Sequence, residues 1–216
     1  MREKKFARTK IALMNAFIER LRKARFDDIS VKEVCQSAEI SEGTFFNYFP
    51  EKIDVITYYA NLMTIGNIWK ARQKSPAGRY IPLLNAFFGE LADHVEAGGV
   101  DITYEFISIM VVRPERPRKN AISNLEKRLF FPELDGIEDI DTFFMDEFFR
   151  DCLEKASKNG ELPVNSGRID NVLVSLLTIM IGTLIAVKFG HDAKNLKNHY
   201  QRHLHMLWHE LGIKKQ

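Results

Sequence analysis

Cysteine is scarce in this chain, and the residues present form no pattern typical of a disulfide framework or a metal site. Only Cys35 and Cys152 occur among 216 residues, and neither belongs to a CxxC pair. A disulfide scaffold and a cysteine-based zinc site are therefore excluded. The start, MREKKF, is not followed by an apolar stretch of the length that a secretory signal needs, so we expect a reducing, cytoplasmic location.

Motifs of the common enzyme classes are also missing. The chain has no nucleophile elbow, Walker loop, dinucleotide fingerprint or HExxH motif. His199 and His203 lie four residues apart with Glu210 near the same helical face, but a histidine-rich terminal helix is more typical of a polar surface or interface than of a zinc site. We therefore predict that the protein is not an enzyme and has no metal and no cofactor.

Strand-like alternation is absent as well. Apolar residues recur with helical spacing throughout, and Gly and Pro fall between the segments, so we predict an all-α fold. With 45% hydrophobic and 28% charged residues, the composition is that of a soluble globular protein with one small module and one larger domain.

Residues 29–55, ISVKEVCQSAEISEGTFFNYFPEKIDV, predict two short helices joined by a tight turn. Ser30 and Glu33 have the spacing of a capping box, which starts the first helix at Val31. This helix is expected to bury Val31, Val34, Cys35 and Ala38. Such a helix-turn-helix pair is typical of proteins that read DNA.

The second helix of the pair is short and amphipathic. Ser41 is its predicted N-cap, and Pro50 ends it. The inward face consists of Phe45, Tyr48 and Phe49, which leaves Glu42, Gly43, Thr44, Phe46 and Asn47 at the rim. We expect Thr44 and Asn47 to meet the major groove, and Gly43 to remove bulk where the two backbones approach.

The amino-acid sequence of this region resembles that of the TetR family of bacterial transcriptional regulators, whose signature is roughly A-G-V-S-x-G-T-x-Y-x-Y-F-x-x-K. The matching positions are Ala38, Ser41, Gly43, Thr44, Tyr48, Phe49 and Lys52. Upstream, the resemblance extends through Thr9, Ile11, Ala16, Phe17, Phe26 and Val31, so it covers about the first 56 residues. Two positions depart from the pattern: Glu39 replaces the turn glycine, and Phe46 replaces a tyrosine whose hydroxyl meets phosphate.

The resemblance implies an N-terminal three-helix helix-turn-helix DNA-binding domain, residues 1–50, followed by a helical ligand-binding and dimerisation domain, residues 51–216. It also implies contacts of Ser41, Thr44, Tyr48 and Lys52 with DNA. Glu39 is expected to add turn strain if its φ is positive, and Phe46 to remove one backbone contact. By analogy, a ligand in the larger domain would displace the helix that starts at Lys52 and so weaken operator binding.

The charges are segregated, although the net charge is only +2. Residues 1–25 carry nine basic and two acidic residues, whereas residues 133–154 carry nine acidic residues and one arginine. A solvated helix face is the expected explanation for the acidic run. Because the basic run adjoins the helix-turn-helix, we predict that Lys4, Lys5 and Arg8 contact DNA phosphates.

Further helices are predicted between the breakers. They are residues 4–24, 52–74, 79–97, 101–112, 117–130, 140–159, 167–189 and 193–211. Within them, Val172–Val187 is apolar on nearly every side and is expected to be buried on more than one side. A membrane span is the alternative, but sixteen residues with interrupting Ser and Thr is short for a bilayer, so we expect no membrane association.

A stripe of small residues suggests how two copies would meet. Ser175, Thr178, Gly182 and Ala186 share one helical face, which permits close approach of another helix. With Leu204 and Trp208 on the last helix they are predicted to form half of an intersubunit four-helix bundle. A lone helix-turn-helix reads too few base pairs for useful specificity, so a homodimer is expected on physical grounds as well.

Aromatic residues are abundant in the larger domain, and most are expected in its core. If a ligand pocket exists there, as the resemblance implies, we predict a largely apolar effector bordered by Trp69, Phe87, Tyr104 and Phe148. The resulting interpretation is a homodimeric, ligand-responsive regulator bound to a double-stranded DNA operator, most simply a repressor. The alternative is a helical protein–protein interaction module without specific DNA binding.

Overall fold

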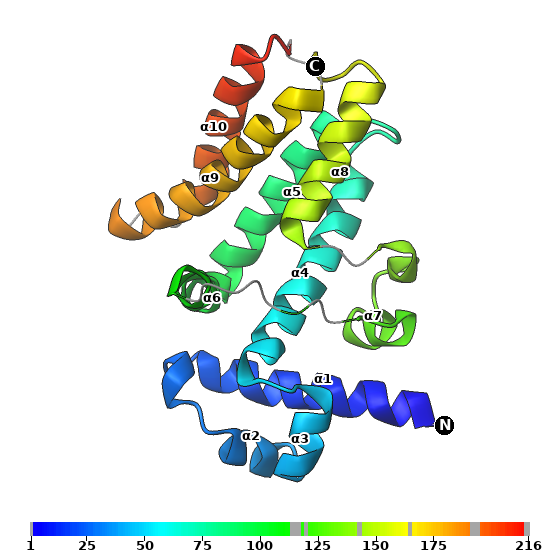
Figure 1. Ribbon diagram of the computed structural model, residues 1–216, viewed down its shortest axis with the longest axis vertical. Coiled ribbons are helices and arrows are strands. Elements are labelled where there is room, and N and C mark those ends of the chain that lie inside the picture. Colours follow the sequence, from blue (N-terminus) through cyan, green and yellow to red (C-terminus); the bar gives the residue numbers. More distant parts are fainter. Residues whose placement is uncertain are drawn as a thin grey trace. The chain divides into compact units, whose positions relative to one another are not determined.

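The computed structural model is helical over the part of the chain that it describes (Figure 1). The described residues are 2–112, 118, 121–141, 144–163, 166–190 and 195–213, without the side chains of 98–100 and 166. No strand occurs within these ranges, and the prediction of an all-α fold is confirmed. By its internal contacts the chain divides into two compact units, residues 1–66 with 101–142 and residues 67–100 with 143–216.

The first unit combines the N-terminal helices with a later part of the chain. Its elements are α1 (Arg2–Leu21), the 3-10 turn η1 (Phe26–Asp28), α2 (Val31–Ser37), α3 (Glu42–Tyr48), the first part of α4 (Lys52–Lys74), α6 (Val100–Val112), α7 (Asn124–Phe130) and the 3-10 turn η3 (Ile137–Asp139). α1 packs against α2 and α7, and α2 packs against α3. The predicted DNA-binding domain, residues 1–50, lies within this unit, and residues 101–142 belong to the same unit.

Apolar side chains at helical spacing form the core of this unit. Leu13, Met14 and Phe17 of α1 are fully buried, as are Phe45 of α3 and Phe49 just after it. At Gly66 of α4, a Cβ atom would lie 2.7 Å from the Cζ atom of Phe131 at the end of α7. A side chain at this position would clash, so glycine permits α7 to approach α4 closely.

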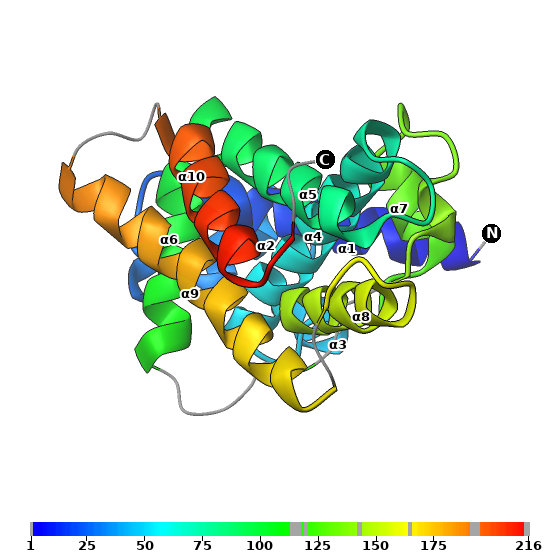
Figure 2. The same cartoon turned by 90° about the horizontal axis from the view of Figure 1, so that it is seen from above.

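The second unit is a group of long helices (Figure 2). Its elements are the end of α4, α5 (Tyr80–His94), the π-helical turn η2 (Val95–Gly99), α8 (Met145–Lys158), α9 (Ser166–Gly190) and α10 (Leu196–Glu210). α5 packs against α8 and α10, and α9 also packs against α8 and α10. Four buried aromatic rings join three of these helices: Phe88 stacks on Phe149 at 5.4 Å and meets Tyr200 edge-on at 5.1 Å, and Phe87 lies 5.6 Å from Phe149.

Some helix limits differ from the predictions. The segment predicted at 117–130 begins its helix only at Asn124, because Ser123 is the N-cap and forms a reciprocal capping box with Glu126. Residues 113–117, 119 and 120 lie outside the described residues. The segment predicted at 140–159 begins its helix at Met145. The break predicted between the helices at 79–97 and 101–112 is instead a π-helical turn, which leads directly into α6.

Helix α9 matches its predicted limits to within one residue at each end but is more exposed than predicted. It spans 25 residues, and the most apolar 18-residue window within Gly167–Gly190 has a mean hydropathy of 2.3, with only 33% of that window buried. By length and composition this is the one candidate membrane span among the described residues, which is weak evidence, because a core helix passes the same test. The expectation of burial on more than one side is therefore not met within a single chain.

Candidate nucleic-acid interface

The turn between α2 and α3 is tight and strained. Val34 and Cys35 of α2 are buried, and the amide of Ile40 donates a hydrogen bond of 2.9 Å to the carbonyl oxygen of Cys35. Glu39 has a φ of 56°, and no other described non-glycine residue has a positive φ. The left-handed conformation costs a side-chain-bearing residue about 1 kcal/mol or more, so the condition for the predicted turn strain at Glu39 is met.

The two short helices start differently. The Ser41 side chain accepts the amide of Thr44 at 3.2 Å, which confirms Ser41 as the N-cap of α3, and the two hydroxyl groups lie 2.8 Å apart. Helix α2 does begin at Val31, but the Ser30 side chain forms no capping hydrogen bond. The predicted capping box of Ser30 and Glu33 is therefore wrong. Glu33 instead offers its carbonyl oxygen to Arg20 of α1 at 2.9 Å.

The outer side of α3 is exposed at key positions. Gly43 and Asn47 are exposed, and Phe46 remains 47% exposed. A Cβ atom added at Gly43 would meet nothing within 4 Å. Internal packing therefore does not require glycine at position 43, and the space beside its Cα is open.

Basic residues of α1 adjoin this helix. Lys4, Lys5 and Arg8 are exposed, as the prediction of phosphate contacts requires. Phe6, between them, places its ring 4.4 Å from that of Tyr48, which is half-buried at the end of α3. Through this contact the start of α1 and the end of α3 are held together.

The Lys52 ammonium group forms its hydrogen bonds within its own chain. Its ammonium group donates to the carbonyl oxygens of Phe26 at 2.7 Å, Ile29 at 3.2 Å and Asp27 at 3.3 Å, and it lies 4.4 Å from the centre of the Phe26 ring. These bonds fix the turn between α1 and α2 to the start of α4. The geometry gives Lys52 a supporting role within the chain, and the contact with DNA that the resemblance implies stays a prediction.

This arrangement resembles that of a solved protein. Over 94% of its length, and over 97% of the other chain, the protein is similar to a putative TetR family transcription regulator from Shewanella sp. PV-4, with a TM-score of 0.59 and 12% sequence identity. The fold is of the TetR type. No family sequence model matches the chain, and neither does any curated protein sequence. The similarity in three dimensions thus establishes the fold that the short sequence signature predicts.

In this TetR-type fold, the four residues predicted to border a ligand do not line a common cavity among those described. Phe87 and Phe148 are buried with ring centres 5.0 Å apart, and Trp69 is half-buried in the same unit. Tyr104 belongs to the other unit, where burial raises the pKa of its hydroxyl. An open groove of about 970 Å³ lies instead between α5 and α10. Its lining includes Ile81, Phe88, Tyr200, Leu204, His205 and Trp208.

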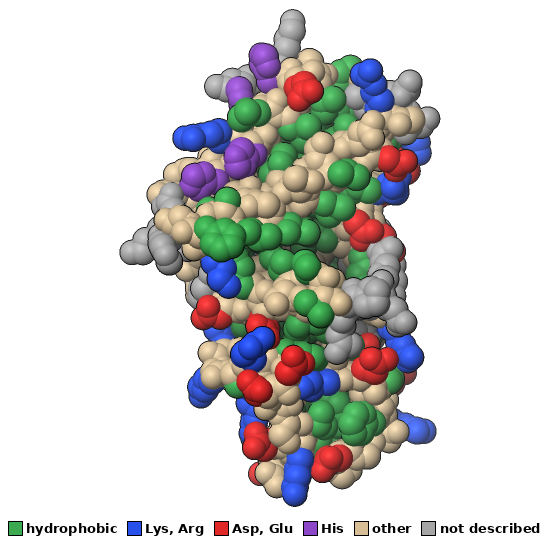
Figure 3. All heavy atoms as spheres, turned by 60° about the vertical axis from the view of Figure 1, so that its left-hand side comes forward, with side chains coloured by type: hydrophobic (Ala, Val, Ile, Leu, Met, Phe, Trp, Pro, Cys, Tyr) green, Lys and Arg blue, Asp and Glu red, His purple; other side chains and the backbone are tan. Residues whose placement is uncertain are grey.

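The residues predicted for a dimer interface fall into two groups. Thr178, Gly182 and Ala186 are exposed on α9, and Ser175 is half-buried. Leu204 and Trp208 are buried within their own chain at 2% and 6% exposure, where they line the groove. Figure 3 shows hydrophobic side chains on the face where α9 and α10 lie, beside the histidines of α10.

The histidines of α10 show no arrangement typical of a metal site. His203 shares a hydrogen bond of 2.9 Å with the Thr183 hydroxyl. Among the described residues, no group of three His, Cys, Asp or Glu side chains lies close enough to hold a metal ion.

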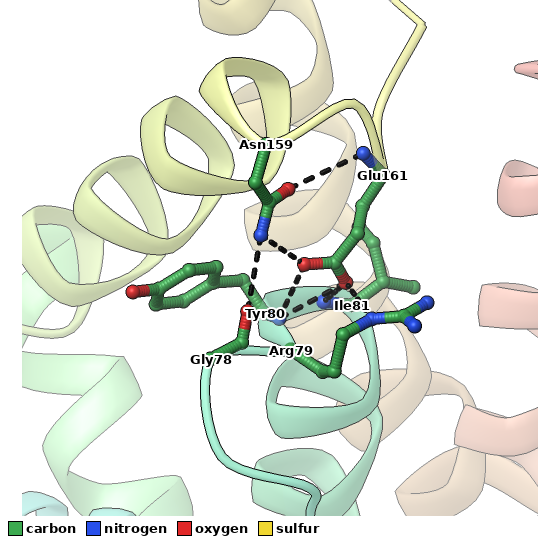
Figure 4. Close-up of polar contacts among 6 residues, drawn as sticks. All are labelled: Gly78, Arg79, Tyr80, Ile81, Asn159 and Glu161. Carbon is green, nitrogen blue, oxygen red and sulfur yellow. Dashed lines mark hydrogen bonds and ion pairs between the residues drawn. The ribbon is translucent and has the colours of Figure 1, made fainter.

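Glu161 is a structural residue that the sequence interpretation missed (Figure 4). Its carboxylate accepts the amides of Tyr80 at 3.0 Å and Ile81 at 3.1 Å, and so caps the start of α5 from the loop after α8. Asn159 donates to it at 2.6 Å, and Arg79 pairs with it at 3.4 Å. Burial alone would raise the pKa of this carboxyl group, but the hydrogen bonds outweigh burial and lower it. No local sequence signal links residues 80 positions apart.

Proposed function

We propose that this protein is a DNA-binding transcriptional regulator that acts as a homodimer and is released from its operator by a small, largely apolar effector. The observation that carries the DNA-binding part is the outer side of α3. There, Gly43, Phe46 and Asn47 are exposed while the inner face is anchored by Phe45. A helix held firmly on one side by a buried aromatic residue, with Gly43 and Asn47 exposed on the other, suits insertion into the major groove.

The contacts with DNA divide into two kinds. Asn47 is suited to bind an adenine edge through its amide, with Thr44 beside it. Lys4, Lys5 and Arg8 of α1 supply charge for phosphates, and Ser41 and Tyr48 supply hydroxyl groups. Lys52 contributes by holding the turn before α2 in place, since its ammonium group binds three carbonyl oxygens there.

The dimer is proposed through α9 and α10. Val174 and Phe189 on α9 are 61% and 79% exposed, and Met206 on α10 is 62% exposed. Exposed apolar side chains gathered on one face mark an interaction surface. A second copy is the occupant expected here, because two recognition helices are needed to read two half-sites, and the small residues Thr178, Gly182 and Ala186 permit close approach of a partner helix.

The effector is proposed to bind the second unit. Occupying the site bordered by Phe87 and Phe148 would require the aromatic cluster to open, whereas the groove between α5 and α10 is already open to solvent. An effector weakens operator binding only if it prefers the non-binding state, by about 1.4 kcal/mol for each tenfold loss of affinity. A repressor is the simplest form of this scheme.

The experiment is selection of bound fragments from genomic DNA, including the promoter region of the protein's own gene. Enrichment of a short two-fold symmetric site is expected, with an affinity that falls as salt rises. A protein–protein interaction module would be favoured instead by weak DNA binding that depends on neither salt concentration nor DNA sequence and that Tyr48→Ala does not change. Compounds that raise the melting temperature are then screened for release of the selected fragment.

A further inference from the structure

A buried charged cluster joins the first helix to a part of the chain more than a hundred residues away. Lys10 of α1 and Glu126 of α7 form an ion pair of 3.0 Å, with side chains only 8% and 5% exposed. Tyr58 of α4 donates its hydroxyl to Glu126 at 2.9 Å, and the Lys10 ammonium lies 4.1 Å from the centre of the Tyr58 ring. Three helices of the first unit therefore meet at one carboxylate.

The carboxylate of Glu126 is itself fixed in place. Ser123 donates both its amide and its hydroxyl to Glu126 at 2.7 Å, and Lys10 also binds the carbonyl oxygen of Ala121 at 3.2 Å. Burial would raise the pKa of Glu126, but these hydrogen bonds and the charge of Lys10 lower it. The Glu126 carboxylate is thus ionised and held in one orientation.

Two other contacts tie the same part of the chain to the N-terminal helices. Glu105 of α6 accepts the amide of Phe26 at the start of η1 at 2.8 Å. Phe131 packs against Gly66 of α4, as described above. Residues 101–142 therefore brace the N-terminal helices at separate points within one compact unit.

We propose that Glu126 is a positioning residue for DNA binding: by holding Lys10, it sets the orientation of α1 and of the basic side chains that α1 carries. Lys10 lies on the buried face of α1, whereas Lys4, Lys5 and Arg8 are exposed on the same helix. A rotation or shift of α1 would move all three cations relative to α3. This inference rests on the proposed function, since it concerns the same DNA-binding surface.

A buried ion pair is a poor means of adding stability, which is why a positioning role accounts for it better. Removing one partner leaves an unpaired buried charge and is strongly destabilising, whereas replacing both partners by neutral groups of similar volume is often neutral. The effect of the ion pair on stability can therefore be measured separately from its effect on the orientation of α1. A double variant is expected to recover stability but not the orientation of α1.

The test compares Lys10→Met, Glu126→Gln and the double variant with the wild type. Melting temperatures are measured, together with affinity for the selected DNA fragment over a series of salt concentrations. Each single variant is expected to have a lower melting temperature than the wild type, and the double variant a melting temperature close to that of the wild type. In the double variant, the slope of log affinity against log salt should fall by about one for each DNA phosphate that the protein no longer neutralises.

A control identifies the cations responsible. Combined replacement of Lys4, Lys5 and Arg8 by Ala should lower the slope by about three per protomer. Adding the double variant to this background should lower it no further, because the same three cations are already absent. If circular dichroism shows the double variant unfolded, Lys10→Arg keeps the ion pair but lengthens it, and the slope is again expected to fall.

The outcomes separate the two claims. A folded double variant, or a Lys10→Arg variant, that keeps the wild-type slope and affinity overturns the positioning role and leaves the proposed function standing. A wild type that binds no fragment in a salt-dependent manner overturns the proposed function and this inference together.

Discussion

Replacing Gly43 by Ala tests the proposed interface with two measurements that should move in opposite directions. Gly43 is the second residue of α3, and a Cβ atom there meets nothing within 4 Å. Alanine stabilises a helix by about 0.5–1 kcal/mol relative to glycine, and no clash inside the chain opposes this gain. Gly43→Ala should therefore raise the melting temperature by about 1–4 °C.

The same methyl group should weaken DNA binding. If Gly43 faces the DNA backbone, the added carbon prevents the closest approach, and we expect at least about a tenfold loss of affinity, or about 1.4 kcal/mol. Fluorescence anisotropy with the selected fragment measures the affinity, and calorimetry measures the melting temperature. An unchanged or tighter affinity in Gly43→Ala would refute the placement of α3 against DNA.

Two glycines in other helices serve as controls. At Gly89 of α5 the nearest atom to an added Cβ is Cε of Lys197 at 3.7 Å, an ordinary contact. Gly89→Ala should be as stabilising as Gly43→Ala without changing DNA affinity. At Gly66 the added Cβ lies 2.7 Å from Phe131, so Gly66→Ala should lose stability, by about 1–3 kcal/mol.

Three further changes test other parts of the proposal. Asn47→Ala should cost about 1–3 kcal/mol of operator affinity and relax the preference at one base pair, as competition with single-base operator variants would show. Glu161→Gln should weaken the cap of α5 by about 1 kcal/mol at neutral pH. Folding lowers the pKa of Glu161, so the stability that its ionised form contributes is present above the unfolded pKa and is lost as pH falls through the folded pKa. In urea titrations at several pH values, the variant should therefore lose less stability in acid than the wild type does. Gly182→Leu should shift the dimer towards monomer in sedimentation equilibrium; a Gly182→Leu variant that dimerises like the wild type would contradict an interface at the small-residue stripe.

The parts of the fold that the sequence predicted correctly depend on local interactions. The start of α3 at Ser41 and its end before Pro50 follow from side chains within a few residues of each helix end. The full length of α4, Lys52–Lys74, follows from the position of its breakers. By contrast, the start of α7 was placed too early, although Ser123 and Glu126 have the spacing of a capping box and would have located it.

Other features that the sequence did not reveal depend on interactions between distant residues. Lys52 appeared as one more cation beside a DNA-reading helix, because the carbonyl oxygens that it binds become neighbours only after the chain folds. Lys10 was counted with the basic run, yet it is buried against Glu126. Helix α9 was expected to be buried on several sides, whereas in one chain only 33% of its most apolar window is buried.

The sequence by itself determined the helical class, the helix-turn-helix and its outward residues, since these depend on periodicity and on caps within one or two turns of helix. Tertiary structure decided which charged residues are free to meet a partner and which are occupied within the chain. It also decided that residues 101–142 belong to the same compact unit as the N-terminal helices. The physical reason is that the energy of a charge depends on its burial and on its partners, and both are set by contacts between residues far apart in the chain.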